Sequence, residues 1–394
     1  MPAYLGDAGD DLRSTLLPAE LLPLFDDRFV RSCDLIEEYI FRLVARIARE
    51  MGLAAALAEG GSVAEIARRA GLDPVAGPPL LDWLLRLLAE RGAIARSDTV
   101  PVRFQISEPL PDLDPAEIET AQAAHDATAL PSFRLAALAA EGYPPVMRGE
   151  TSGESVLFAA DRMTNWSEYF SNQNPLYAIS NEIGARAVRG RFPHPQGTLL
   201  EIGGGFGSGA MALLDGFEQA GAAARITAYR FTELSPIFLR RGQRTLASRP
   251  DARGRITCAR LDLNRPFAEA GMEPASLSIV YGVNTLHVAH DLAFTLREIH
   301  TALAPGGLVV ASECVRPFPG RTVHVEFVFQ LLESFRSPVL HPAWRPTGGF
   351  LTPEQWTTAF RAAGFVDPFV WPDIPRIRDY YPAFVVAAVG ASRL

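Results

Sequence analysis

The second half of the chain alternates apolar segments with amphipathic ones, and this alternation constrains the fold more than any other sequence feature. From Gly197 onward, apolar segments such as TLLEIGG, RITAYRFTE and SLSIVYGVN are separated by segments with helical periodicity, such as MALLDGFEQA. Strands and helices that alternate in this way form a largely parallel sheet with helices on its faces. We therefore predict a doubly wound α/β domain over residues 196–394.

The first half of the chain has a mainly helical pattern. Apolar residues recur at helical spacing over residues 34–59 and 79–92, and Ser62 and Glu65 form a capping-box pattern at the start of a helix between them. Residues 93–107 favour a short hairpin, so residues 1–110 have the outline of a winged-helix domain. We predict a second helical segment, a linker or substrate cap, over residues 111–195.

Charge argues against nucleic acid as a partner of this helical domain. The whole chain carries a net charge of −8, and residues 1–110 contain 12 arginines against 17 acidic residues. Such a surface repels phosphate backbones. We therefore expect the domain to mediate homodimer formation, and we expect no nucleic-acid partner.

Composition excludes several kinds of chemistry. All 37 basic residues are arginines, and without lysine a Schiff-base mechanism or a P-loop lysine is impossible. Three widely spaced cysteines indicate neither a metal site nor a disulfide framework. The acidic N-terminus lacks a signal-peptide pattern, and no apolar run is long enough to cross a membrane. We expect a cytoplasmic protein with no metal and no membrane partner.

A glycine-rich turn, EIGGGFGSG at residues 201–209, follows the first predicted strand and precedes a helix. Gly203 and Gly205 allow a tight turn and a close approach of the backbone to a ligand, and the helix N-terminus offers free N–H groups. A dinucleotide is one candidate ligand, but Ser208 occupies the third glycine position of its fingerprint, and Glu201 would repel a pyrophosphate. The ammonium and sulfonium groups of S-adenosylmethionine suit Glu201 better.

Two further acidic residues, Glu233 and Asp262, stand at the C-terminal ends of the next two predicted strands. Glu233 can accept hydrogen bonds from both ribose hydroxyls of such a ligand, Asp262 can accept one from the adenine amino group, and Leu263 can cover the ring. In open α/β sheets, ligands bind at the carboxyl edge, where these residues are expected to lie. Acids that merely cap helices on a solvated edge are the alternative interpretation.

The ends of the fourth and fifth predicted strands carry a candidate general base. His287 lies in NTLH and Glu313 in ASE, and neighbouring parallel strands would bring the two together. A carboxylate can orient an imidazole and stabilise its protonated form. We predict His287 as the base, assisted by Glu313, with His290 as the rival candidate.

These motifs resemble those of the class I S-adenosylmethionine-dependent methyltransferases. The similar segments are LLEIGGGFGSG, YRFTELSPIFLRRGQ, ARLDLNRPF and VNTLHVAHDLAFTLREIHTALAPGGLVVASE. The resemblance implies a seven-stranded Rossmann-like sheet, and it adds Leu234 and Asn284 to the cofactor-binding positions. The first half is similar in outline to the winged-helix dimerisation module of small-molecule O-methyltransferases. The implied cofactor is S-adenosylmethionine, with S-adenosylhomocysteine as its product.

Two subfamilies compete within this resemblance. His287 matches the base of winged-helix O-methyltransferases, whereas NTLH together with Glu313 matches the dyad of polyketide C-methyltransferases more fully. O-methyltransferases of plant type carry a second Glu before the late helix, and residues 348–352 hold no acid. This departure favours C-methylation slightly. A cyclase or pericyclase that keeps the cofactor without transferring methyl remains the alternative function.

The acceptor is expected to be a small molecule of natural-product type. The segment NWSEYFSNQNPLYAISNEIG at residues 165–184 combines aromatic side chains with several amides, and buried amides need hydrogen-bond partners. We name four candidate acceptor-lining residues in it: Trp166, Tyr169, Asn174 and Tyr177. The sequence leaves open which acceptor binds and whether it is free or carrier-bound.

Overall fold

The computed structural model describes residues 13–249, 254–377 and 384–394, which divide into two compact units. The sheet unit comprises the described residues of three ranges, 1–30, 170–321 and 338–394. The helical unit comprises residues 31–169 and 322–337. The glycine-rich turn and the segment that carries His287 both belong to the sheet unit.

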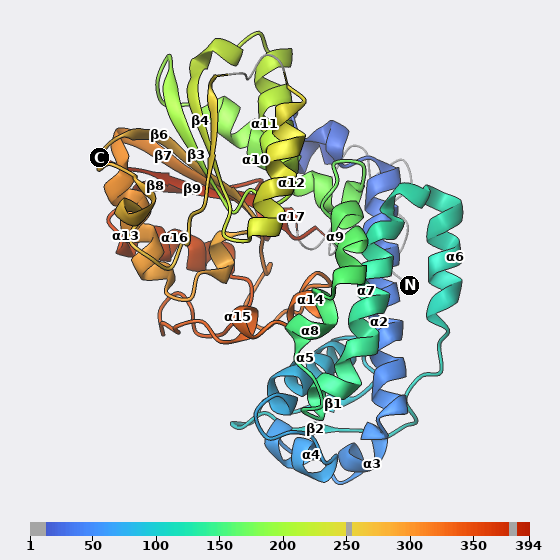
Figure 1. Cartoon of the computed structure of the whole chain (residues 1–394). Helices are drawn as coiled ribbons and strands as arrows, with labels where there is room; N and C mark the ends of the chain where they lie inside the picture. Colours follow the sequence, from blue (N-terminus) through green and yellow to red (C-terminus); the bar gives the residue numbers. More distant parts are fainter. Residues whose placement is uncertain (1–12, 250–253, 378–383) are drawn as a thin grey trace. The chain divides into compact units, whose positions relative to one another are not determined.

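A seven-stranded sheet forms the centre of the sheet unit, in the order β5-β4-β3-β6-β7-β9-β8 (Figure 1). The first five of these are mutually parallel, whereas β9 is antiparallel to both β7 and β8. The strands are β3 Gly197–Ile202, β4 Ile226–Thr232, β5 Ile256–Ala259, β6 Leu277–Val283, β7 Leu303–Cys314, β8 Val366–Trp371 and β9 Val386–Ser392. The predicted doubly wound α/β class and the number of strands are confirmed.

Helices cover both faces of this sheet, with α10, α11 and α12 on one side and α13 and α16 on the other (Figure 1). Gly184 lets α10 lie close to β6 and β7, since a Cβ at this position would approach the Tyr281 hydroxyl to 2.8 Å. The helices are α10 Pro175–Arg191, α11 Ser208–Gln219, α12 Pro236–Ala247, α13 Leu292–Ala302, α16 Pro353–Ala362 and the short α17 Ile374–Ile377.

The central strands are buried on both faces, as the near-continuous apolar runs of β3, β6 and β7 require. Strand order reverses between β3 and β6, because the chain goes from β3 outward to β4 and β5 and then returns to β6. A crevice outside the carboxyl ends of the strands forms at such a reversal. The glycine-rich turn and the segment that carries His287 follow these two strands.

The helical unit is built from long and short helices and one two-stranded ribbon. Strand β1 Ala95–Arg96 pairs antiparallel with β2 Phe104–Gln105, so the predicted hairpin is confirmed. Helix α2 begins in the sheet unit at residue 27. The helices are α2 Asp27–Glu50, α3 Leu53–Ala58, α4 Val63–Arg69, α5 Gly77–Glu90, α6 Pro115–Asp126, α7 Leu130–Met147, α8 Gly153–Leu157, α9 Met163–Tyr169, α14 Glu326–Phe329 and α15 Glu333–Arg336.

Residues 322–337 return to the helical unit, and buried hydrogen bonds tie them into its core. The buried carboxylate of Glu326 accepts a hydrogen bond of 2.9 Å from the Trp83 indole. The Tyr143 hydroxyl donates one of 2.7 Å to the carbonyl of Phe327 and stacks on its ring. The sequence does not indicate this association, because the partners are about 180 to 240 residues apart. Among the described residues, no helix is long and apolar enough to span a membrane.

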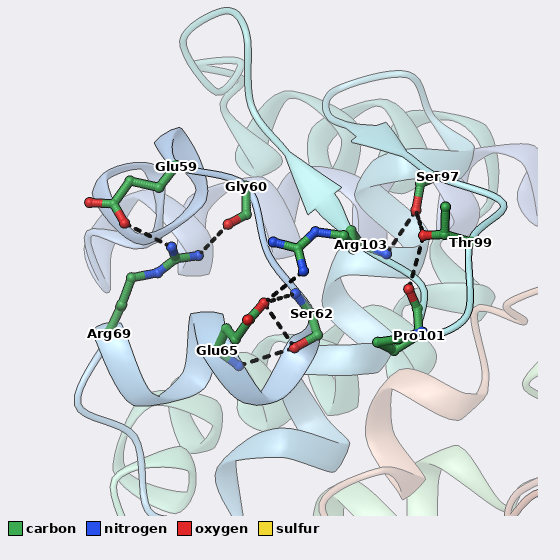
Figure 2. Close-up of polar contacts among 9 residues, drawn as sticks. All are labelled: Glu59, Gly60, Ser62, Glu65, Arg69, Ser97, Thr99, Pro101 and Arg103. Carbon is green, nitrogen blue, oxygen red and sulfur yellow. Dashed lines mark hydrogen bonds and ion pairs between the residues drawn. The ribbon is translucent and has the colours of Figure 1, made fainter.

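The capping box predicted at the start of α4 is present (Figure 2). The Ser62 hydroxyl accepts from the Glu65 amide, and the Glu65 carboxylate accepts from the Ser62 amide at 2.8 Å. Arg103 on the hairpin contacts the same carboxylate at 3.1 Å, and its amide donates to Ser97. The pairing satisfies helix N–H groups that would otherwise have no partner.

We expect Ser62→Ala to lower the free energy of unfolding by about 1 kcal/mol, because the Glu65 amide loses its acceptor. Ser62→Thr keeps the hydroxyl and is the matched control. Urea denaturation measures the loss, and hydrogen exchange over residues 63–69 locates it. Equal stability of the alanine and threonine variants would contradict this role.

Candidate functional site

The glycine-rich turn lies directly after β3 and leads into α11. Gly203, Gly205 and Gly207 have φ values of 63°, 56° and 87°, a region that L-residues rarely adopt. A Cβ at Gly203 would lie 2.4 Å from the Thr285 hydroxyl, and one at Gly204 would lie 2.1 Å from the Phe231 ring. A Cβ at Gly205 would meet no described atom within 4 Å. The turn therefore packs tightly against the fold and exposes bare backbone at Gly205.

Glu233 joins this turn to the start of α12. Its carboxylate accepts hydrogen bonds from the amides of Gly205 at 3.0 Å and Ser235 at 2.8 Å. Burial raises the pKa of Glu233, and these backbone hydrogen bonds oppose the rise. The predicted ribose-binding acid thus also shapes the loop, which the spacing alone did not indicate.

Glu201 is almost fully buried at the end of β3 and accepts a hydrogen bond of 2.8 Å from the Tyr229 hydroxyl. Burial raises the pKa of Glu201 to about 8. The carboxylate of Glu233 adds to that rise, and the Tyr229 hydrogen bond opposes it. A cation beside Glu201 would favour its ionised form.

Two hydrogen-bonded asparagines, one on α10 and one in the segment before it, add hydrogen-bonding groups to the surroundings of the Glu201 carboxylate. Asn181 donates to the side-chain oxygen of Asn172 at 2.7 Å, and Asn172 donates to the carbonyl of Ser208 at 2.9 Å. The Asn181 Oδ1 atom is buried and has no hydrogen-bond partner among the described residues. It lies near the Glu201 carboxylate, since a Cβ at Gly209 would meet both, at 3.4 Å and 3.1 Å. Two acceptors here suit a ligand that donates several hydrogen bonds.

The other candidate cofactor-binding residues lie at or near the same edge. Strand β5 ends at Ala259, earlier than predicted, so Asp262 and Leu263 belong to the turn that follows it and are partly exposed. The Leu234 side chain is 41% exposed beside Glu233. Asn284 has φ of 48°, and its amide group donates to Ser180 at 3.2 Å and accepts from the Cys314 amide at 2.9 Å.

His287 and Glu313 are in direct contact at the ends of β6 and β7. His287 Nδ1 lies 2.6 Å from Glu313 Oε2, and both side chains are buried. The other carboxylate oxygen, Oε1, accepts from the amides of Thr285 at 3.1 Å and Leu286 at 2.7 Å. The Phe350 ring packs edge-on against the imidazole. Glu313 thus orients both the imidazole and the turn that carries it.

The four candidate acceptor-lining residues divide between the two units. Trp166 and Tyr169 belong to the helical unit, where Trp166 is buried and donates to the carbonyl of Leu157 at 2.7 Å. Asn174 and Tyr177 belong to the sheet unit and are buried at the start of α10. Burial raises the pKa of Tyr177, against a hydrogen bond with Ser208.

The sequence motifs do not predict an aromatic cluster that lies in the sheet unit. Phe206, inside the glycine-rich turn, packs with its ring centroid 4.9 Å from Phe238 and 5.7 Å from Phe170. Phe170 in turn packs edge-on against Tyr177 at 5.0 Å. The position of Phe206 between glycines was the one sequence feature that could have indicated this cluster.

His290, the rival candidate for the base, is exposed. No group of three metal-ligating side chains occurs among the described residues.

Comparison with known proteins finds a family match for the part of the chain that carries the glycine-rich turn and His287. Residues 200–309 match the family model of a methyltransferase domain. Highly reducing polyketide synthase 2 of Gibberella zeae is 26% identical over 255 residues, which is 63% of this chain and 9% of that protein. Methyltransferase calH of Penicillium decumbens is 27% identical over 212 residues, which is 52% of this chain and 50% of that protein. The chain therefore spans half or less of the length of these curated relatives.

A solved structure confirms the fold over nearly the whole chain. The crystal structure of the CurJ carbon methyltransferase superposes with a TM-score of 0.77 and covers 98% of each chain. Sequence identity is 20%, so this likeness establishes the fold alone.

The buried Glu201 predicts a pH dependence of stability. Between pH 4.5 and about 8 the folded chain keeps a proton on Glu201 that the unfolded chain has released. Stability from this group therefore falls as pH rises through that range and is level above it. We expect Glu201→Gln to gain about 1 to 4 kcal/mol relative to the wild type between pH 5 and pH 8. Urea denaturation at several pH values measures the gain, and Glu354→Gln, on the exposed start of α16, is the control. A pH-independent difference would contradict the assignment.

Proposed function

Residues 200–309 form a methyltransferase domain on a class I methyltransferase fold, and from this premise we propose that the chain transfers a methyl group from S-adenosylmethionine to a small natural-product acceptor. The observation that carries the proposal is that two features lie at the same edge of the sheet. The glycine-rich turn at residues 201–209, here called the cradle, follows β3, and the buried pair of His287 and Glu313 lies at the ends of β6 and β7. The whole protein's substrate and partners are part of the proposal, since the relatives are longer.

The residues of the cradle fit this cofactor. The backbone at Gly205 is bare, and a Cβ there would meet no described atom within 4 Å, which leaves room for the amino-acid part of the cofactor. The buried acceptors Glu201 and Asn181 suit its ammonium group, and Glu233 and Asp262 suit its ribose and adenine. When bound, it supplies a methyl group activated by a sulfonium. The proposed binding set is completed by Leu234, Leu263 and Asn284.

His287 is proposed as the group that takes the acceptor proton. A proton on Nδ1 directed to Glu313 at 2.6 Å places the basic lone pair on Nε2. The Glu313 carboxylate then stabilises the imidazolium that forms. Because Glu313 also accepts from two amides of the same turn, the base is oriented before the acceptor binds. A proton bound to the acceptor carbon is only weakly acidic. Its removal therefore requires a positioned base.

We favour a carbon acceptor over an oxygen acceptor. The reasons are the NTLH and SE segments that supply His287 and Glu313, the lack of an acid at residues 348–352, and the similarity to a polyketide synthase. For the acceptor pocket we propose Asn174 and Tyr177, which are buried at the start of α10 in the sheet unit. The assignment of Trp166 and Tyr169, which belong to the helical unit, stays a prediction from the sequence. The helical unit is further proposed to mediate homodimer formation, which sedimentation measures.

The proposal is tested by binding and by product analysis. Calorimetric titration with S-adenosylhomocysteine is expected to give saturable binding, and NAD is expected to give none. Incubation of labelled S-adenosylmethionine with β-ketoacyl thioesters is expected to yield a C–CH₃ signal in the product by NMR. An O–CH₃ signal would reject the carbon acceptor. A protein that accelerates conversion of an added acceptor without consuming the methyl group would be a cyclase instead.

We expect His287→Ala to lower kcat by about 10²- to 10⁴-fold, the usual contribution of a positioned general base. Affinity for S-adenosylhomocysteine should stay within about threefold, because the proposed cofactor contacts are elsewhere. His290→Ala, which removes an exposed imidazole three residues away, is the matched control. Full activity of the first variant, or loss of activity in the second alone, would overturn the assignment of the base.

A further inference from the structure

Residues 338–350 form a loop of the sheet unit that contacts the turn carrying His287 at several points. The amide of Val339 donates to the carbonyl of His290 at 2.7 Å, and the Phe350 ring packs on the imidazole. Between them, the Arg345 side chain reaches the carbonyls of His287 and Ala289. The loop is therefore attached to both ends of the turn and to the catalytic ring itself.

Arg345 is the unusual member of this loop, because its guanidinium is fully buried. One Nη donates to the carbonyl of Ala289 at 2.9 Å, and the other donates to the carbonyl of His287. Its Nε atom has no hydrogen-bond partner among the described residues. Its own backbone pairs with His341 in both directions. Burying a guanidinium is costly, so a structural need for two carbonyl contacts alone is a weak reason for it.

The charges around Arg345 come from several elements. The carboxylates of Glu313 on β7 and Asp291 at the start of α13 stabilise its positive charge, and Arg316 opposes them. Burial outweighs these effects and lowers the pKa of Arg345 to about 10. The side chain is therefore cationic at neutral pH. Glu313 consequently interacts with two groups that can carry positive charge, Arg345 and His287.

This arrangement bears on the protonation of His287. A buried His–Glu pair alone is neutral when the imidazole carries a second proton, so the pair favours the imidazolium, which cannot act as a base. With Arg345 present, the three groups are already neutral overall while the imidazole is neutral. Protonation of His287 then adds an uncompensated positive charge to a buried site.

We propose that Arg345 is a positioning residue that holds the His287 turn through two carbonyls and keeps His287 neutral, and hence basic, in the resting enzyme. The inference deepens the proposed function and rests on it. The basicity of His287 then depends on two further side chains, Glu313 and Arg345. The sequence motifs contain His287 and Glu313 but not Arg345. Removal of the positive charge of Arg345 should therefore raise the pKa of His287.

The test compares the pKa of His287 in the wild type, Arg345→Met and Arg345→Lys, each without added ligand. Protein labelled with ¹³C at histidine Cε1 gives this pKa by NMR titration, and His287→Ala assigns the signal. We expect the methionine variant to raise the pKa by at least about one unit, since a buried charge near the imidazole is lost. The lysine variant should stay within about 0.3 units of the wild type while its kcat falls, because an ammonium keeps the charge but lacks the rigid fork whose two nitrogens each reach one carbonyl.

Turnover gives a second readout. The acidic limb of the pH profile of kcat/KM should move upward in Arg345→Met by the same amount as the NMR value. Arg249→Met is the matched control, since Arg249 is also buried but pairs with Asp215 and Glu218 on α11. This control should leave the His287 pKa unchanged. If Arg345→Met does not fold, Arg345→Gln removes the charge and keeps a donor.

An unchanged His287 pKa in the neutral variant that folds would overturn the inference, as would an equal rise in the Arg249 control. These outcomes are distinct from failure of the proposed function. That failure would appear as wild-type protein without methyl transfer, whereas the NMR titration does not depend on turnover.

Discussion

The buried carboxylate of Glu313 is the group on which the proposed catalytic site depends. It accepts from the amides of Thr285 and Leu286 and lies 2.6 Å from His287 Nδ1, so a side chain at the end of β7 orients the segment that follows β6. Such a carboxylate is costly to bury, and three donors offset that cost. The parallel pairing of β6 with β7 makes this contact possible, because it brings the two carboxyl ends together.

Ligand binding and proton transfer are proposed for different positions along the same edge of the sheet. At the end of β3, Glu201 and Glu233 surround a glycine turn whose backbone is bare, which suits a ligand with cationic and hydroxyl groups. At the ends of β6 and β7, His287 and Glu313 form a dry pair suited to moving one proton. The reversal of strand order between β3 and β6 places these two sites side by side.

Two buried acids at this edge, Glu201 and Glu233, have a pKa raised by burial, and the hydrogen bonds that oppose the rise differ between them. Glu201 has one hydrogen-bond donor from Tyr229 and a pKa raised by burial to about 8. Glu233 accepts hydrogen bonds from backbone amides, including those of Gly205 and Ser235, that oppose the effect of burial. A bound cation would compensate Glu201, so ligand binding and ionisation are coupled at this position.

The sequence by itself determined the α/β alternation, the glycine turn, the capping box at Ser62 and the His287–Glu313 pair, because each follows from local periodicity or from residues at predictable strand ends. Only the tertiary structure decided which distant residues complete these features. Arg345 reaches the His287 turn from a loop about 58 residues later, and Asn181 faces Glu201 from a preceding helix. Neither contact has a sequence period or fixed spacing. Both depend on how loops and helices pack over the sheet edge, which is a property of the folded chain.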